Sequence, residues 1–432
     1  MTQPPDAVAE GLTRLRPREG LAYGLLGLPL AFVALPLYVM LPHHYAQQYG
    51  VPLATLGLVL LLARLFDAVV DPWLGRLTDR LYTHSLRRVL HSGVLAAVVL
   101  ALGLSALFFP QVQGSSALAL WAWAMLVVAT TAYSWLGIAH QSWGARLGGG
   151  EAVRGRIVAW REGAGLIGVV LASLLPVLWG LPAMLAVFVL ALGGGCWAWW
   201  RAPRPVLAVA ASEAMAQDLW RPWRQPGFRR LFVVFVLNGI ATAVPATLVL
   251  FFIQDRLLSP ASDQPLFLGT YFVTAALGMP LWLRGVQRWG LARTWLLGMV
   301  LAVLTFAWAS GLGSHDRWAF WVVCALSGLA LGSDLALPSA LLAGVIAQHG
   351  DRGRHDGAYF GWWNFAAKLN LALAAGLALP LLGWWGYVPG QQDPVGLQAL
   401  TWAYAVLPCG LKLLAGAALY ALVIRPSHRS TP

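Results

Sequence analysis

Charged residues are scarce in this chain. Only 11% of its 432 residues are Asp, Glu, Lys or Arg, whereas 59% are hydrophobic. This composition is far too apolar for a soluble protein of this size and indicates a polytopic membrane protein. Basic residues outnumber acidic ones by 29 to 17, a formal net charge of +12. In a membrane protein this excess is expected in cytoplasmic loops, not in a nucleic-acid-binding surface.

Cysteine is also rare, and its placement excludes two further classes. The three cysteines lie singly inside apolar runs (Cys196, Cys324 and Cys409), so neither a disulfide framework nor a metal site is expected. His43 and His44 lack a third ligand at zinc spacing. Residues 1–20 lack the apolar core of a signal peptide and are interpreted as a cytoplasmic lead-in.

Long apolar runs, by contrast, are abundant. Their length predicts an all-α membrane protein with twelve transmembrane helices. The expected spans are 21–46, 52–78, 89–110, 117–147, 157–180, 182–200, 229–255, 265–289, 293–312, 317–348, 358–386 and 397–424.

The loop arginines predict the orientation. They lie before the first span and after each even-numbered span, whereas the opposite connections hold only Arg256 and Arg317. Because basic loops stay on the cytoplasmic side, both termini are expected in the cytoplasm. An even number of spans requires the same result.

The spans divide into two sets of six. We expect an N-terminal half at 21–200, a cytoplasmic linker at 201–228, a C-terminal half at 229–424 and a cytoplasmic tail at 425–432. A basic loop follows the second span of each half, which is typical of a parallel internal repeat.

Two acids stand inside the second span. Asp67 and Asp71 are four residues apart and share a helix face with Arg64. Asp67 is expected about 15 Å inside the hydrocarbon, where ionisable groups usually face a bundle interior or a watery cavity. The two carboxylates could bind sodium or share a proton, with Arg64 and Lys368 balancing the empty state. The alternative is a static salt-bridge lattice between helices.

These residues resemble the major facilitator superfamily and, within it, the glycoside–pentoside–hexuronide:cation symporter family, which includes the melibiose permease. The matching stretches are DAVVDP at 67–72 with Gly75 and Asp79, Arg161 in AWREGAGLIG, and GAYFGWWNFAAK at 357–368. The resemblance covers nearly the whole chain. It implies a cation-coupled solute transporter in which the two halves give alternating access.

The resemblance also has departures. Two sugar-binding acids of the family are replaced here, one by the apolar region around Pro29 and the other by Gly137, and a sodium-supporting asparagine is replaced by Val70. Tyr133 and Ser134 match a Tyr–Thr pair beside the family's cation site. We therefore expect a cation site of Asp67, Asp71, Tyr133 and Ser134, and a solute other than a galactoside. Val70 slightly favours a proton over sodium.

Several other polar or aromatic residues are candidates for binding the solute. Asp334 lies between Gly332 and Pro338, which can open a helix. It could be a solute or proton ligand opposite Lys368, or an acid near the outward end paired with a neighbour. The remaining candidates are Lys368, Arg64, Trp135, His140, Gln141, Trp363 and Asn364.

Some polar and aromatic residues of the spans have a structural alternative or remain without a role. His140 could instead be hydrogen-bonded to a neighbouring helix, and most of the tryptophans are expected at the membrane interfaces. Lys412 has no obvious partner in the sequence.

A gate is expected at the cytoplasmic side. Asp79 with Arg80, Arg87 and Arg88 resembles the superfamily's loop motif, whose role would be to hold the second and eleventh helices together. Arg161 could belong to this gate or anchor its helix at the interface. Like Lys368, it could also pair with the acids of the second span or with an anionic group of the solute.

The sequence therefore favours a proton- or sodium-coupled secondary transporter of a small organic solute in a bacterial cytoplasmic membrane. Its expected partners are the solute, the coupling cation and the lipid bilayer. We expect no other cofactor, no nucleic acid and a monomer. A carrier of a lysolipid-like amphiphile is the alternative, and a membrane-embedded enzyme or receptor is less favoured because no nucleophile, base and oxyanion donors cluster together.

Overall fold

The computed structural model describes residues 14–205, 218–314 and 316–426. All regular elements in these ranges are helical. The α-helices are α1 (Pro17–Gly24), α2 (Gly27–Phe32), α3 (Leu41–Tyr49), α4 (Leu53–His84), α5 (Leu86–Phe108), α6 (Ser115–Leu147), α7 (Glu151–Trp200), α8 (Arg221–Arg224), α9 (Pro226–Phe251), α10 (Gln264–Ala309), α11 (Arg317–Gln348), α12 (Asp356–Trp384), α13 (Pro394–Thr401) and α14 (Leu407–Leu419).

Short segments of other helix types continue several of these helices. The π-helical turns are Pro36–Met40, Phe252–Arg256, Trp402–Val406 and Tyr420–Ile424, and a 3₁₀ turn is at Ala261–Asp263. The span expected at 21–46 is therefore not one regular helix, because α1, α2 and α3 share it with a π-helical turn. Pro29, Pro36 and Pro42 lack the backbone N–H that a continuous α-helix needs.

Among the residues that the structure describes, seven helical segments are long and apolar enough to cross a membrane. They are Leu86–Phe108, Ser115–Leu147, Glu151–Trp200, Pro226–Arg256, Gln264–Ala309, Arg317–Gln348 and Pro394–Ile424. The helical elements and these apolar segments confirm the predictions of an all-helical fold and of a multi-pass membrane protein.

Two of these segments contain a sharp break at glycine. Gly180 in α7 has φ 79° and ψ 173°, and Gly290 in α10 has φ 80° and ψ 170°. Only glycine reaches this backbone region without strain. The breaks lie where the sequence predicted one span to end and the next to begin, at 180–182 and 289–293.

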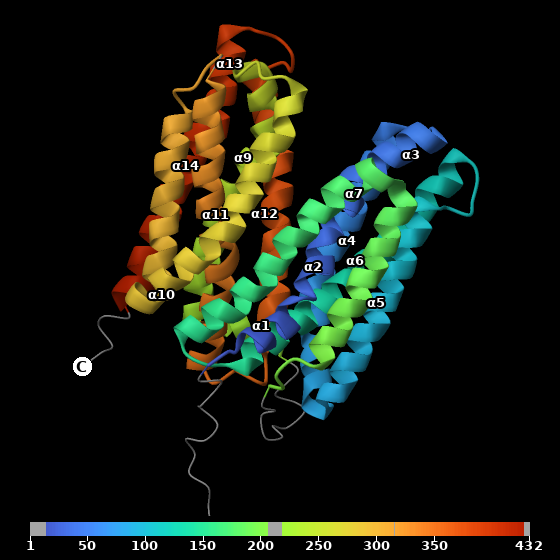
Figure 1. The fold of residues 1–432 in the computed structure, drawn as a ribbon, viewed down its shortest axis with the longest axis vertical. Helices are drawn as coiled ribbons and strands as arrows, with labels where there is room; N and C mark the ends of the chain where they lie inside the picture. The colour runs from blue at the N-terminus through green and yellow to red at the C-terminus, as the bar shows by residue number, and fades with distance from the viewer. Residues whose placement is uncertain (1–13, 206–217, 315, 427–432) are drawn as a thin grey trace, which may run out of the picture. The chain divides into compact units, whose positions relative to one another are not determined.

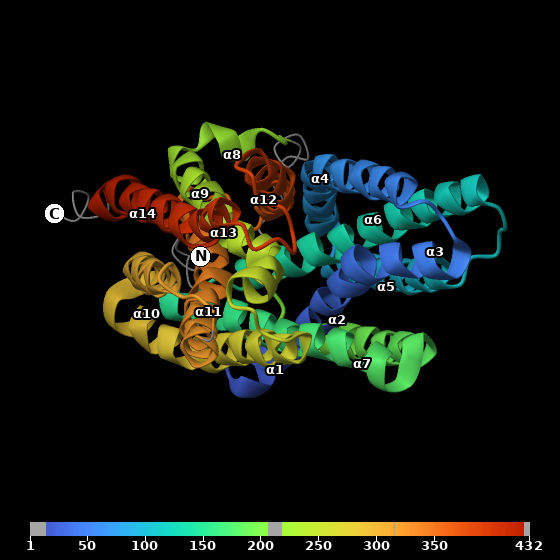
Figure 2. The same ribbon diagram turned by 90° about the horizontal axis from the view of Figure 1, so that it is seen from above.

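The chain forms two compact units. Unit 1 comprises residues 1–224 and 343–365, and unit 2 comprises 225–342 and 366–432. Helices α11 and α12 each contribute to both units. The elements of each unit can be followed by colour in Figure 1 and from above in Figure 2.

Each unit has its own apolar core. In unit 1, α2 packs on α7, and α6 packs on both α4 and α5. Trp143 and Trp199 are fully buried there with ring centroids 5.4 Å apart. In unit 2, Phe252 stacks on Tyr404 at 4.2 Å between centroids. These cores fix the helices that carry the polar residues described next.

Candidate functional site

The two acids of α4 are buried in unit 1. Asp67 is 2% exposed and Asp71 is 0% exposed. Ser134 on α6 donates a hydrogen bond of 2.8 Å from its hydroxyl to Oδ1 of Asp67. The structure thus brings together one acid and one hydroxyl of the expected cation site, held by the packing of α6 on α4.

Two further candidates surround this pair. Tyr133, the residue before Ser134, is half-buried and within electrostatic range of both Asp67 and Asp71. Arg64 is half-buried one turn before Asp67 on α4. A carboxylate pair with hydroxyl groups beside it supplies the hard oxygen ligands that sodium prefers, and it can equally hold a proton.

Helix α4 meets the beginning of α12 through glycine. A Cβ atom on Gly75 would lie 2.0 Å from the carbonyl oxygen of Gly357, and one on Gly361 would lie 2.6 Å from the carbonyl oxygen of Asp71. No side chain fits between the two backbones at these points. The contact of Gly75 with Gly357 and of Gly361 with Asp71, called the glycine contact below, joins two stretches on which the family resemblance rests.

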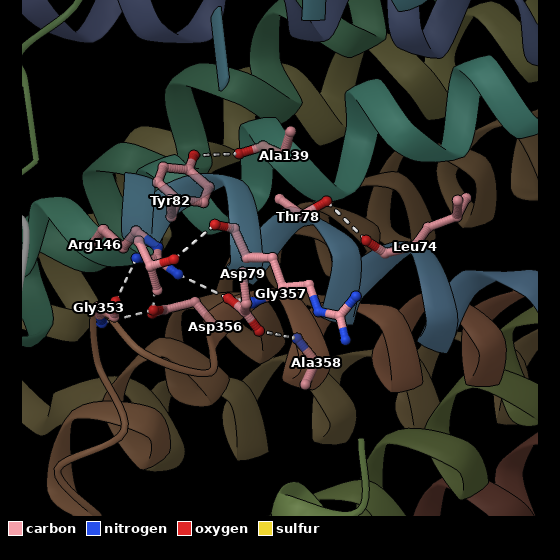
Figure 3. A network of polar contacts seen from close by, with 12 residues as sticks. Leu74, Thr78, Asp79, Tyr82, Ala139, Arg146, Gly353, Asp356, Gly357 and Ala358 are labelled. Atoms are coloured by element: carbon pink, nitrogen blue, oxygen red, sulfur yellow. Dashed lines mark hydrogen bonds and ion pairs between the residues drawn. The ribbon is translucent and has the colours of Figure 1, made fainter. Parts of the chain in front are cut away.

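Directly beyond the glycine contact, Asp79 is bound by donors from two other elements. Its Oδ1 accepts hydrogen bonds of 2.8 Å from the N–H of Gly357 and 2.7 Å from Arg146 on α6, and its Oδ2 accepts one of 2.8 Å from the N–H of Ala358. The two N–H groups belong to the first turn of α12, whose dipole favours a negative charge. Figure 3 shows this arrangement.

Arg146 is the centre of the cluster. It is 3% exposed and also lies 3.2 Å from Asp356, donates to the carbonyl oxygen of Gly353 at 2.6 Å and covers the ring of Tyr82 at 3.9 Å. One guanidinium therefore joins two buried carboxylates, an arrangement suited to its planar, forked donors. We call Asp79, Arg146 and Asp356 the Arg146 cluster.

Burial changes the acidity of both carboxyl groups in the Arg146 cluster. Asp79 lies just past the expected end of the second span, and burial raises its pKa to about 7 against the opposing effect of Arg146. Burial likewise raises the pKa of Asp356, again opposed by Arg146. The cluster therefore takes up protons more readily than exposed carboxylates would.

The sequence predicted the acid of this cluster but not its basic partner. Asp79 was expected to act with Arg80, Arg87 and Arg88, yet the ion pair of Asp79 in the structure is with Arg146. Arg87 and Arg88 are exposed, and Arg80 is half-buried. Arg146 occupies the last turn of α6, before three consecutive glycines. This position at a helix end was the only signal in the sequence that could have identified Arg146 as the partner of Asp79.

Arg161 lies inside unit 1. It is buried in α7 and forms an ion pair with its neighbour Glu162. A Cβ atom on Gly27 would lie 2.3 Å from the carbonyl oxygen of Arg161, so α2 crosses α7 closely here. This buried position does not match a residue that extends to the membrane interface, as the anchoring alternative required.

His140 and Gln141 differ in their surroundings. His140 is fully buried, with Nε2 2.8 Å from the carbonyl oxygen of Tyr23 and its ring stacked on Tyr23 at 4.3 Å. This geometry favours the structural alternative for His140. Gln141 is half-buried, and its buried Oε1 has no hydrogen-bond partner in the part of the chain that the structure describes.

The aromatic candidates are spread over unit 1. Trp135 donates from Nε1 to Ser92 at 3.2 Å, between α6 and α5. Trp363 is buried in α12, whereas its neighbour Trp362 donates to the carbonyl oxygen of Leu219 at 3.0 Å. Asn364, the residue after Trp363, is half-buried. None of these contacts links them to Asp67 or Asp71.

The remaining charged candidates belong to unit 2. Lys368 is half-buried near the middle of α12. Asp334 on α11 forms an ion pair with Lys412 on α14. Lys412 had no expected partner, and Asp334 was expected opposite Lys368. The pairing of Asp334 with Lys412 favours the alternative in which this acid is bound to a neighbouring helix.

The described ranges contain no group of three or more His, Cys, Asp or Glu placed to hold a metal ion. His43 is exposed, and His44 is buried with Nε2 3.0 Å from the carbonyl oxygen of Phe108.

Comparison with solved structures identifies the fold. A bacterial homologue of the iron transporter ferroportin, in an outward-facing state, gives a TM-score of 0.72 at 15% identity and covers 95% of this chain and 100% of its own. The fucose:proton symporter of E. coli gives a TM-score of 0.63 at 14% identity and covers 92% of this chain and 98% of its own. At these identities the likeness establishes the fold alone.

The sequence comparisons identify the family. No curated protein matches the chain significantly. Residues 21–425 match the family model described as MFS/sugar transport protein. The predicted resemblance to the major facilitator superfamily is thereby confirmed, and the family is one of transporters, not of enzymes. The chain belongs to the MFS/sugar transport protein family.

Proposed function

We propose that this protein is a secondary active transporter in which binding of a proton or sodium ion drives the movement of a small organic solute. The observation that carries the proposal is the buried pair of Asp67 and Asp71 on α4, with Ser134 bonded to Asp67. Ionisable groups buried in a membrane protein are costly and are retained mainly for function.

The proposed coupling follows from the charge of this pair. Two carboxylates one helical turn apart repel each other, and a bound cation removes that repulsion. Neutralised acids can change their surroundings at a lower desolvation cost, so cation binding would permit the exchange between inward- and outward-open states. The Arg146 cluster, which ties α4 to the start of α12 and the end of α6, would be the cytoplasmic gate that forms and breaks in this cycle.

The proposal includes the topology expected from the sequence. It places twelve spans in two halves, both termini in the cytoplasm and the monomer in a bacterial cytoplasmic membrane. The family description and the fucose:proton symporter among the structural neighbours support a sugar or a sugar-like solute and a proton as the ion. Loss of the two sugar-binding acids, at Pro29 and Gly137, argues against a galactoside.

Transport into proteoliposomes tests the proposal. The purified protein is reconstituted with a pH-sensitive dye inside the vesicles, and hexoses, pentoses and their glycosides are added under an imposed inward gradient of protons or sodium. We expect at least one solute to accumulate only while a gradient is present. With a proton gradient, that solute also acidifies the interior.

The variant Asp71→Asn provides the site-specific test. Without the second carboxylate the cation site loses one of its two negative charges, so gradient-driven accumulation is expected to disappear while the protein elutes and melts as the wild type does. Asp263→Asn is the matched control, because Asp263 forms a partly exposed pair with Arg317 at 3.5 Å, far from the acids in sequence. Accumulation by Asp71→Asn at the wild-type level would contradict the coupling role.

A further inference from the structure

Unit 2 contains a cavity that has no part in the proposed cation site. Its volume is about 160 Å³, and α9, α10, α11, the π-helical turn Trp402–Val406 and α14 contribute to its wall. Most of the wall is apolar, with Phe272 and Phe306 among the lining residues. At one place the lining is charged, because Asp334 and Lys412 also border the cavity.

The charged groups form a neutral, nearly saturated pair. Asp334 accepts hydrogen bonds from Trp295 at 2.9 Å and Thr242 at 3.2 Å in addition to its ion pair with Lys412. Lys412 also donates to Oδ1 of Asn238 at 2.9 Å. A lysine ammonium has three N–H groups, so one donor of Lys412 remains after these two bonds.

Two tyrosine hydroxyls in the cavity wall also lack partners. Tyr271 and Tyr404 both line the cavity, and neither hydroxyl has a hydrogen-bond partner among the described residues. Tyr404 is only 4% exposed. Tyr271 is half-buried. Buried hydroxyl groups are usually bonded to protein, to water or to a ligand. Tyr404 also belongs to the π-helical turn Trp402–Val406, and such turns often mark functional sites.

From this wall we infer that the cavity binds a neutral organic molecule with a single six-membered ring and one oxygen acceptor. Apolar cavities of about 150 Å³ hold one benzene ring, which matches the available volume. The oxygen would accept from the remaining N–H of Lys412 or from the tyrosine hydroxyls. We call this the unit-2 site.

The same lining argues against other ligand classes. A sugar would bury several hydroxyl groups against Phe272, Phe306 and aliphatic side chains without partners, which is costly. A carboxylate would add a net charge to a pair that is already neutral, in surroundings of low polarity. The inference does not rest on the proposed cation coupling, because it concerns different residues in a different unit.

Fluorine NMR with 4-fluoroacetophenone as the probe tests the unit-2 site. The full-length protein in detergent is titrated into the probe, and a saturable change of the ¹⁹F signal is expected. For 4-fluorobenzoate, which has the same ring and a negative charge, we expect binding at least about tenfold weaker. Equal binding of the two probes, or a signal that never saturates, would overturn the inference.

A cavity-filling variant localises the binding. Ala330 is buried on α11 and lines the cavity, so Ala330→Leu is expected to abolish the saturable signal. Ala325→Leu is the matched control, because Ala325 is half-buried on the same helix and outside the cavity lining. If Ala330→Leu retains wild-type binding, the probe occupies another place, the cavity holds only water, and the inference is wrong.

The polar contacts are tested separately. Tyr271→Phe and Tyr404→Phe remove one hydroxyl each, and loss of the hydroxyl that bonds the probe is expected to weaken binding about two- to tenfold. Tyr387→Phe, outside the cavity, should leave binding unchanged. The double variant Lys412→Met with Asp334→Asn removes both charges together, so no unpaired charge is left buried. It should also weaken binding of the probe. Unchanged affinity in Tyr271→Phe, Tyr404→Phe and the double variant would contradict the assigned contacts.

Discussion

Replacing Arg146 with methionine removes the one positive charge that two buried carboxylates share. In the wild type, Arg146 lies 2.7 Å from Asp79 and 3.2 Å from Asp356, and all three side chains are at most 1% exposed. Removing one partner of a buried ion pair typically costs about 3–5 kcal/mol. At roughly 2–4 °C per kcal/mol for a domain of this size, Arg146→Met is expected to melt about 6–20 °C below the wild type.

The assay is thermal unfolding of the purified protein in detergent, followed by tryptophan fluorescence. The loss should be larger at pH 8 than at pH 5, because protonation at low pH neutralises the carboxylates that Arg146 no longer pairs. Arg87→Met is the control, since Arg87 is exposed and its loss should shift melting by less than about 1 °C. An Arg146→Met protein that melts with the wild type at pH 8 would refute the assignment of Arg146 as the centre of the cluster.

Three further predictions concern the same unit. Because the pKa of Asp79 is raised from 3.8 to about 7, the folded state binds more protons than the unfolded state between these values, so stability should fall as the pH rises through 7. Asp79→Asn should flatten this slope, and an unchanged slope would exclude Asp79 as its source. Gly75→Ala places a Cβ atom 2.0 Å from the carbonyl oxygen of Gly357, so melting should drop by several degrees; wild-type melting would show that α4 and α12 do not touch there. Ser134→Ala removes the 2.8 Å bond to Asp67 and should weaken cation-dependent transport about two- to tenfold, read as the ion concentration at half-maximal rate; an unchanged value would remove Ser134 from the site.

Much of the fold could be predicted because it depends on local properties of the chain. Apolar length predicted helical segments, and α11 occupies the residues expected for the tenth span. The ends of the apolar runs also predicted boundaries at 180–182 and 289–293, where α7 and α10 break at Gly180 and Gly290. The division of the first span was not predicted, because a length criterion ignores the missing donors of Pro29 and Pro36.

The polar contacts were harder to predict because they depend on which helices meet. The neighbouring acids Asp67 and Asp71 are visible as a local pattern, and the family resemblance supplied Ser134 as their partner. Arg146 stands 67 residues from Asp79 in the sequence, and Lys412 stands 78 residues from Asp334. No local pattern joins such residues, so the sequence left Lys412 without a partner and assigned Asp79 to the arginines nearest to it.

The glycine contact has a mechanical consequence. Interlocked side chains must change rotamer before two helices can separate, whereas bare backbones can part without that step. Where Gly75 faces Gly357, the surfaces are smooth, so resistance to separation there is concentrated in a few discrete polar bonds beside them. At such a junction, a change of the charge on Asp79 would decide whether α4 and the first turn of α12 stay in contact.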